Sequence, residues 1–220
     1  MDVVITIRCR KRKIVGAKST KKGEKQMKKI LVAYSTNAGS TVEVAQAVGE
    51  ELGKGGNQVD VCPIKDITSL EQYTAVVVGA PMIMGWHTHA VSFVKKHQGE
   101  LSKLPVAYFL AAMSLTQDSK HKNIEISISV DPQLAKPPKN PDKLSFREGY
   151  ATVDNYLQKA LKAAPKVKPV SIAFFGGKLD IARLKWWQNL FVSFVVQAKP
   201  GDYRNWPFIR QWANILRARL

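Results

Sequence analysis

The sequence is poor in the residues that disulfide frameworks, metal centres and catalytic triads require. Its 220 residues include two cysteines, Cys9 and Cys62, and no C-x-x-C pair, so we predict neither a disulfide framework nor a cysteine-based zinc site. His87 and His89 form an H-x-H pair with no Cys or acidic residue beside them, which is too few ligands for a closed metal site. No Ser/His/Asp or Cys/His arrangement typical of nucleophilic catalysis stands out. The sequence therefore predicts no metal and no catalytic triad of side chains.

Long hydrophobic runs are also missing. No segment reaches the roughly 18–20 apolar residues that a membrane-spanning helix needs. The apolar stretch Val3–Ile7 is too short for the hydrophobic region of a secretory signal and precedes the basic residues instead of following them. Together with the low cysteine content, this predicts a cytoplasmic protein.

Acidic residues are scarce, with 17 Asp and Glu against 34 Lys and Arg and a net charge of +17. Residues 1–29 hold eleven of the basic residues against Asp2 and Glu24, which gives this segment +9 and leaves +8 for the remainder. We expect residues 1–26 to form a basic, disordered extension. A basic arm could bind nucleic acid or an anionic membrane. We favour a plain extension or a start codon assigned too early, and expect no specific nucleic-acid partner.

Apolar, β-branched runs are abundant in the sequence, and they alternate with segments of helical periodicity. This alternation predicts one α/β domain over residues 27–220, a doubly wound five-stranded parallel sheet of order 2-1-3-4-5 with helices on both faces. Its ligand should lie beyond the first and third strands. A long loop insertion is expected around residues 117–145. The expected strands are Lys29–Tyr34, Gln58–Ile64, Thr74–Gly79, Val106–Ala112 and Val170–Phe175, and the expected helices are Thr41–Gly53, a short turn near Ser69–Tyr73, His89–Gln98, Phe146–Ala163, Trp186–Val196 and Pro207–Arg217.

A hydroxyl-rich loop joins the first strand to the first helix. The N–H groups at the start of a helix attract an anion, and a phosphate fits such a loop. The loop has no G-K-[ST] and no spaced glycines, so it is neither a nucleotide P-loop nor a dinucleotide fingerprint. The alternative is an ordinary turn in which Ser40 or Thr41 caps the helix. The residues assigned to the phosphate are Ser35, Thr36, Asn37, Ala38, Gly39, Ser40 and Thr41.

Two further loops follow apolar strands, Pro81–His87 after the third and Met113–Thr116 after the fourth. With these loops in this order, the chain resembles the flavodoxin family, and within it the branch of menaquinone-dependent protoporphyrinogen IX dehydrogenases. The resemblance covers about Met27 to the C-terminus. The narrower resemblance is carried by Gly79-Ala80, Gly85 with His87 and His89, Phe93–His97, Phe174–Asp180, Lys185–Trp187 and Gly201–Trp206.

The resemblance implies an FMN cofactor, with its phosphate on the first loop and its isoalloxazine ring held by the other two. We expect Trp86 to stack on the ring, although an indole can equally cover a hydrophobic edge. One of the two histidines would lie near the flavin and the other in solvent. The ring-binding residues implied are Pro81, Met82, Ile83, Met84, Gly85, Trp86, His87, Met113, Ser114, Leu115 and Thr116.

Two segments leave alternatives open. The proline-containing stretch Asp131–Asp142 is either a functional insertion near the active site or a disordered surface excursion. The segment Lys185–Gln197 has a wider apolar arc than one core-facing stripe requires. One alternative is that this segment packs on the sheet, with its extra apolar surface covered by the last helix or by a partner subunit. The other is that it is a membrane-surface helix.

The function implied is an FMN-binding oxidoreductase in which the flavin does the redox chemistry. The sharper hypothesis is a dehydrogenase, peripheral on the inner face of the membrane, that takes electrons from a porphyrinogen or another reduced small molecule and passes them to a quinone. The rival is a soluble electron carrier that docks with protein partners. A third class is a nucleic-acid or membrane binder on a degenerate flavodoxin scaffold. The basic charge of the domain favours the membrane-linked hypothesis.

Overall fold

The computed structural model describes residues 5–6, 27–83, 85–117, 126–140, 142–179 and 200–220. Its main sheet is parallel throughout, in the order β1-β3-β2-β4-β5-β9-β7. The five strands from β3 to β9 confirm the predicted 2-1-3-4-5 order, and β1 and β7 extend the two edges. The strands are β1 Ile5–Thr6, β2 Lys29–Tyr34, β3 Gln58–Pro63, β4 Ala75–Pro81, β5 Val106–Ala112, β7 Ser127–Val130 and β9 Ser171–Gly176.

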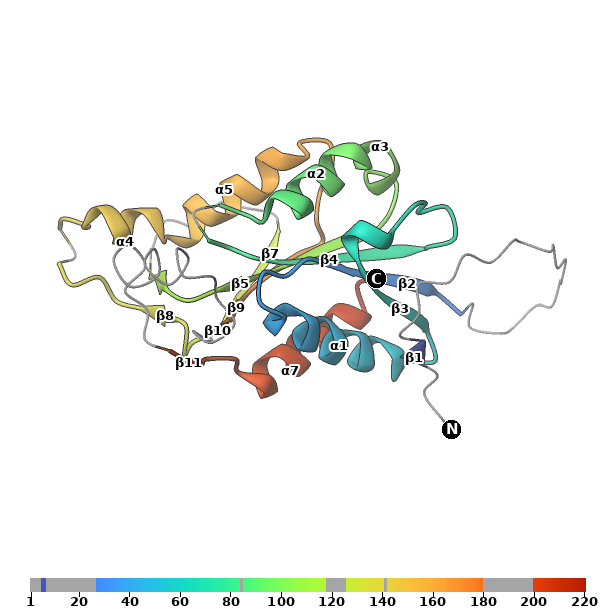
Figure 1. The fold of residues 1–220 in the computed structure, drawn as a ribbon, viewed down its shortest axis with the longest axis horizontal. Helices are drawn as coiled ribbons and strands as arrows, with labels where there is room; N and C mark the ends of the chain where they lie inside the picture. Colours follow the sequence, from blue (N-terminus) through green and yellow to red (C-terminus); the bar gives the residue numbers. More distant parts are fainter. Residues whose placement is uncertain (1–4, 7–26, 84, 118–125, 141, 180–199) are drawn as a thin grey trace, which may run out of the picture.

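Helices cover both faces of this sheet (Figure 1). Helices α1 (Ser40–Gly53) and α7 (Trp206–Arg217) lie on one face, and α2 (Thr88–Lys96), α3 (Gln98–Leu101) and α5 (Val153–Ala163) lie on the other. Successive residues of a strand point to opposite faces. Leu31 of β2 thus joins the α2–α5 core, whereas its neighbours Ile30 and Val32 join the α1–α7 core. Two hydrophobic layers therefore fix the sheet between the helices.

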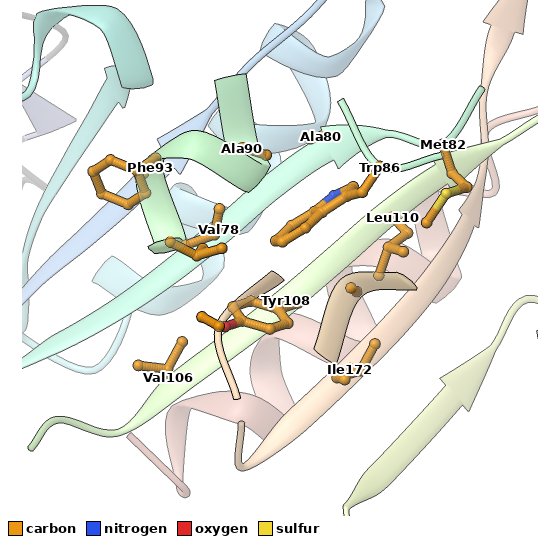
Figure 2. Packing of buried hydrophobic residues seen from close by; sticks show 14 of the residues in the cluster. Val78, Ala80, Met82, Trp86, Ala90, Phe93, Val106, Tyr108, Leu110 and Ile172 are labelled. Carbon is orange, nitrogen blue, oxygen red and sulfur yellow. The ribbon is translucent and has the colours of Figure 1, made fainter. Parts of the chain in front are cut away.

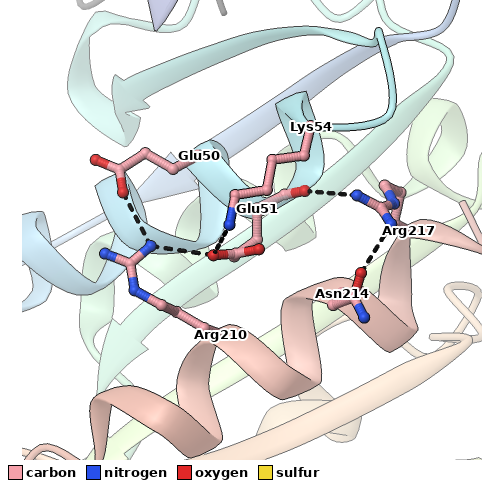
Figure 3. Close-up of polar contacts among 6 residues, drawn as sticks. All are labelled: Glu50, Glu51, Lys54, Arg210, Asn214 and Arg217. Atoms are coloured by element: carbon pink, nitrogen blue, oxygen red, sulfur yellow. Dashed lines mark hydrogen bonds and ion pairs between the residues drawn. The ribbon is translucent and has the colours of Figure 1, made fainter.

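Polar contacts add to the packing of α1 against α7 (Figure 3). The Arg210 guanidinium donates to Glu50 and Glu51, at 3.0 and 3.1 Å, and the Lys54 ammonium lies 2.6 Å from Glu51. Burial raises the pKa of Glu51, but the hydrogen bonds from Lys54 and Arg210 outweigh it and leave that pKa lowered. Arg217 also donates to the Glu51 carbonyl oxygen at 3.4 Å. These contacts tie the last helix to the first.

Two expectations about local structure are wrong. The single helix predicted over Phe146–Ala163 is two helices, α4 (Phe146–Tyr150) and α5. The break falls where the Ala151 carbonyl accepts from the Thr116 N–H at 2.8 Å and the Thr152 hydroxyl caps α5. The helical turn expected near Ser69–Tyr73 is only a turn at residues 71–72, and the 3₁₀ helix η1 lies earlier, at Ile64–Asp66.

Several short strands were not predicted. Strands β6 (Leu115–Thr116) and β8 (Ala135–Lys136) pair with each other, as do β10 (Lys178–Leu179) and β11 (Gly201–Asp202). The expected insertion thus includes β7 and β8.

The predicted helix Trp186–Val196 lies outside the described residues, as do residues 7–26 of the predicted extension. The disorder expected for residues 1–26 therefore stays a prediction, and within that segment only Ile5–Thr6 is described, as β1 beside β3. In the part of the chain that the structure describes, no helix is long and apolar enough to cross a membrane.

Candidate functional site

Backbone hydrogen bonds hold the loop between β2 and α1 at both ends. The Ser35 N–H donates to the Gly79 carbonyl at 3.0 Å, which fixes the start of the loop to β4. The Gly39 N–H donates to the Thr36 hydroxyl at 2.9 Å, and Gly39 itself has φ of +90°, a left-handed conformation that glycine adopts without strain. Helix α1 therefore begins at Ser40 with a tight turn immediately before it.

This loop retains the capacity to bind an anion. The Ser35 hydroxyl is 6% exposed and has no hydrogen-bond partner among the described residues, a state that costs about 1–3 kcal/mol for a buried polar group. The residue at the N-cap is Gly39, and no side-chain hydrogen bond caps α1 within the described residues. The alternative in which Ser40 or Thr41 only caps the helix is therefore wrong. A phosphate oxygen would supply acceptors for this hydroxyl and for the N–H groups of the first helical turn.

The loop after β4 is a tight reversal at the same edge of the sheet. The Met82 N–H donates to Ala111 of β5 at 2.8 Å, and the His87 N–H donates back to the Pro81 carbonyl at 3.1 Å. Gly85 has φ of +148°, which favours glycine at the turn. Ile83 is exposed at the tip, and Met84 lies outside the described residues. The loop thus offers an exposed aliphatic side chain and backbone groups to a ligand.

His87 joins this second loop to the first. Its Nε2 lies 2.9 Å from the Asn37 side-chain oxygen, and its Nδ1 accepts the His89 N–H at 3.3 Å. Because Nδ1 accepts, we assign the proton to Nε2, which donates to Asn37. Burial and the neighbouring His89 lower the pKa of His87. The neutral ring therefore links the two loops predicted to contact the phosphate and the flavin, while His89 is exposed.

Trp86 points into the protein instead (Figure 2). Its side chain is 4% exposed and packs on Tyr108 of β5 with ring centroids 5.0 Å apart. Burial also raises the pKa of Tyr108. These contacts favour the alternative in which the indole covers a hydrophobic edge, and stacking on a flavin would require the side chain to turn outward. Met82, another predicted ring contact, is buried in the same cluster.

The third predicted loop is only partly at the surface. Met113 is half-buried and Ser114 is exposed, so both can reach a ligand at the sheet edge. Leu115 and Thr116 are buried in β6. The structure therefore brings the three loops together at the carboxyl ends of neighbouring strands β2, β4 and β5, with the first half of this third loop accessible. The assignment of individual residues to a cofactor stays a prediction.

A buried arginine that sequence reasoning missed supports the first loop. The Arg204 side chain is 3% exposed, and its guanidinium donates to both carboxylate oxygens of Asp202, at 2.7 and 2.5 Å. It also donates to Glu43 at 2.9 Å and to the Ser40 carbonyl at 3.3 Å. The hydrogen bonds from Arg204 lower the pKa of Asp202. Arg204 therefore holds the first turn of α1. It lies in Gly201–Trp206, one of the segments that carry the family resemblance, and this was the sequence feature that could have identified it.

A second missed residue is Asp131, at the end of β7. Its carboxylate is fully buried, and Oδ1 accepts from the Asn205 side chain at 3.0 Å and from the Gln133 N–H at 2.9 Å. Its Oδ2 has no hydrogen-bond partner among the described residues. Asp131 thus fastens the edge strand to the start of α7, which follows Arg204 in the chain.

The doubly wound parallel sheet with the central order β3-β2-β4-β5-β9 is the architecture of a flavodoxin-like protein. Residues 31–204 match the family model of the flavodoxin domain, and the chain belongs to that family. This confirms the predicted family and fold.

The chain is also similar to two protoporphyrinogen IX dehydrogenases [quinone]. It is 25% identical to that of Escherichia coli (strain K12) over 197 residues, which are 84% of this chain and 93% of the relative. It is 25% identical to that of Leishmania major over 201 residues, 86% of this chain and 74% of the relative. The predicted resemblance to this branch is thereby confirmed as a similarity.

Two solved flavodoxin structures are similar to this chain at low identity. A flavodoxin from the domain Archaea has a TM-score of 0.46 and 12% identity, with 87% of this chain and 97% of the other covered. A Fusobacterium nucleatum flavodoxin bound to flavin mononucleotide has a TM-score of 0.44 and 10% identity, with 88% and 99% covered. Both TM-scores are below 0.5, so these likenesses carry no weight for the site.

Proposed function

We propose that this protein is an FMN-dependent oxidoreductase that binds the cofactor at the carboxyl end of β2, β4 and β5. The observation that carries the proposal is the buried Ser35 hydroxyl, at the start of the loop between β2 and α1, which has no hydrogen-bond partner among the described residues. FMN supplies the redox chemistry when it is bound. The residues of this chain bind, orient and shield it.

The phosphate would be held by the Ser35 hydroxyl and by the N–H groups of residues 36–41 other than that of Gly39, which donates to the Thr36 hydroxyl. Asn37 is oriented by its hydrogen bond to His87, which keeps the first two loops at a fixed separation. Arg204 holds the Ser40 carbonyl and Glu43, which keeps the first turn of α1 aligned. Binding to such a preorganised site requires little further ordering of the backbone.

The flavin ring would lie against the second and third loops. Ile83 and Met113 can cover its faces with apolar surface, and the backbone around Gly85 can approach it closely because no Cβ intervenes. The inward packing of Trp86 leaves this part of the ring site open to a second molecule. We therefore propose that a reduced substrate reaches the flavin from this side.

The substrate proposal is a porphyrinogen as electron donor and a quinone as acceptor. Its support is the similarity, over most of both chains, to relatives named as protoporphyrinogen IX dehydrogenases [quinone]. The charge of +8 outside residues 1–29 also disfavours a carrier that presents an acidic surface to its partners. Peripheral attachment to the inner face of the membrane would bring the protein to its quinone.

Titration calorimetry with FMN and riboflavin tests the cofactor proposal. Ser35→Ala should weaken FMN binding by about 10- to 150-fold, as expected for a lost hydrogen bond to a charged group, and leave riboflavin binding unchanged. The unliganded variant should be at least as stable as the wild type, because a buried hydroxyl without a partner has been removed. Ser92→Ala, at an exposed position of α2, is the matched control. Equal affinity of the wild type for FMN and riboflavin would contradict the proposal.

An anaerobic assay tests the substrate proposal. The FMN-loaded protein should oxidise protoporphyrinogen and reduce a quinone with matching rates. If a protein redox partner is reduced instead and the porphyrinogen is not oxidised, the soluble electron carrier becomes the better description.

A further inference from the structure

An exposed apolar tip projects from the structure around α4. We define the α4 tip as residues 139–140 and 142–150. Phe146 is 84% exposed and Leu144 is 38% exposed. The ring of Phe146 lies 6.3 Å from that of Tyr150, one turn further along the helix. The tip thus presents two large apolar side chains and an aromatic ring on one short segment.

The backbone beneath Phe146 is well braced, so its exposure is not that of a frayed end. The Ser145 hydroxyl accepts the Glu148 N–H, and the Glu148 carboxylate accepts the Ser145 N–H at 2.9 Å, a complete capping box. The other carboxylate oxygen accepts the Lys139 N–H at 2.8 Å. Hydrogen bonds from the N–H of Lys139 and from Ser145 lower the pKa of Glu148 to about 2. The loop therefore holds Phe146 outward in a defined conformation.

The charges around the exposed rings are mainly basic. Lys139, Lys143 and Arg147 lie within nine residues of one another. The ammonium group of Lys159 lies 3.5 Å from the centre of the Tyr150 ring. Of the two carboxylates on the tip, that of Glu148 is directed at the loop backbone, and the other belongs to the exposed residue Asp142. Apolar side chains flanked by Lys and Arg are typical of a surface that lies on anionic lipid.

The tip lies at the end of the molecule where the main strands have their carboxyl ends (Figure 1). Helix α4 is drawn at the far left, beyond the labels of β8, β10 and β11, while β1 is toward the opposite end. The three loops of the candidate site also follow the carboxyl ends of their strands. A surface that met the α4 tip would therefore face the same end as the candidate cofactor site.

We propose that the α4 tip is a docking surface for an anionic lipid bilayer. Phe146 and Leu144 enter the boundary between headgroups and acyl chains, and Lys139, Lys143 and Arg147 lie among the lipid phosphates. The evidence for docking is the exposure and charge of the tip. Its use, to bring the site to a membrane-dissolved quinone, rests on the proposed function.

A fluorescent reporter at position 146 tests this proposal in the full-length protein. An environment-sensitive dye is attached to Phe146→Cys in a Cys9→Ser background, since Cys62 is buried. The matched control carries the dye at Ile215→Cys, another exposed apolar position, on α7. The emission at position 146 should shift to the blue with vesicles containing phosphatidylglycerol, and much less with pure phosphatidylcholine. The emission at position 215 should not change.

Sedimentation with the same vesicles gives the size of the effect. Phe146→Ser should weaken binding about tenfold, as expected when one large apolar side chain loses partial burial, and Ile215→Ser should bind like the wild type. An unchanged emission at position 146, or an equal response to neutral and anionic vesicles, would overturn the proposal. FMN content is measured separately: loss of flavin binding with an intact response at position 146 would refute the proposed function and leave the docking surface standing.

Discussion

Two loops at the same end of the sheet are held in opposite ways. The candidate phosphate loop, residues 35–41, is fixed by partners far away in the sequence. Asn37 binds His87, 50 residues on, and the Ser40 carbonyl binds Arg204, 164 residues on. The α4 tip is fixed by near neighbours, since Glu148 binds Ser145 and Lys139, three and nine residues away.

The two loops should therefore respond differently to mutations elsewhere in the protein. A loop held by distant partners exists only when the whole domain has folded, so a change far from it can alter its ligand affinity. A loop held by neighbours keeps its shape through its own contacts, and its loss need not spread. The former suits a site that requires a fixed geometry, and the latter suits a surface that meets a deformable partner such as a bilayer.

The largest effect on stability is expected at Gly176, which packs closely against the backbone of Tyr203. A Cβ added at Gly176 would lie 1.9 Å from the Tyr203 carbonyl oxygen, so Gly176→Ala must displace backbone next to Arg204. We expect the free energy of unfolding, measured by urea denaturation, to fall by about 3 kcal/mol. FMN binding, measured by flavin titration, should also weaken. Gly99→Ala is the control, because a Cβ there meets no atom within 4 Å. A fully stable Gly176→Ala with normal flavin affinity would contradict the close approach.

The next effect is expected at Arg204. Arg204→Met keeps much of the apolar stem and removes the guanidinium hydrogen bonds to Asp202, Glu43 and Ser40, while the backbone N–H of residue 204 can still donate to Asp202. We expect the free energy of unfolding to fall by about 2 kcal/mol. This is less than for a fully buried ion pair, because 40% of the Asp202 side chain and 51% of the Glu43 side chain are exposed. FMN affinity should fall more than riboflavin affinity, since the loosened turn is the phosphate end.

The exposed Arg210 on α7 gives the matched comparison for Arg204. Arg210→Met should cost about 1 kcal/mol or less and leave flavin selectivity unchanged, because Lys54 still neutralises Glu51. If both variants lose stability and flavin selectivity equally, the special position of Arg204 is refuted.

The sequence predicted the central sheet because its strands are apolar on both faces. Runs such as Ile30–Tyr34 and Ala75–Gly79 are read correctly as buried parallel strands without knowledge of their neighbours. Strand β7, Ser127–Val130, alternates Ser with Ile or Val and is half-buried throughout. Such a segment becomes an edge strand only because β9 is available to pair with it, which local pattern cannot reveal.

The limits at the site have the same physical origin. Loop composition predicted where an anion could bind, since hydroxyls and a free helix start are local features. The orientation of Trp86 was not predictable in this way, because it depends on the hydrophobic space around Tyr108. The break between α4 and α5 depends on Thr116, which donates to Ala151 from 35 residues away. Distant partners thus contribute to both of these features, which local reasoning missed.

A smaller effect is expected from pH, through His87. Its pKa is lowered in the folded protein, so the unfolded chain takes up a proton more readily as the pH falls below about 6.5. The stability that the neutral ring contributes is therefore present above that pH and is lost as the pH falls toward the lowered folded-state pKa. Urea unfolding at pH 7 and pH 5 should show a smaller decrease for His87→Gln than for the wild type. Identical pH dependence in the two proteins would show that folding does not lower the pKa of His87.

The smallest effect on the whole domain is expected at Glu148. Where the effect of Glu148→Gln is felt tests whether the α4 tip is held by neighbouring residues alone. With the pKa of Glu148 lowered to about 2, its carboxylate stabilises the local fold of the α4 tip above the ordinary value near 4.5, and this local contribution is lost as the pH falls toward 2. Glu148→Gln at neutral pH should speed amide hydrogen exchange at Lys139 and Ser145 several-fold, because their acceptor loses its charge. Exchange at Gly39, in the candidate phosphate loop, and the melting temperature should stay as in the wild type. Faster exchange at Gly39 would show that the tip is coupled to the rest of the domain and that its bracing is not local.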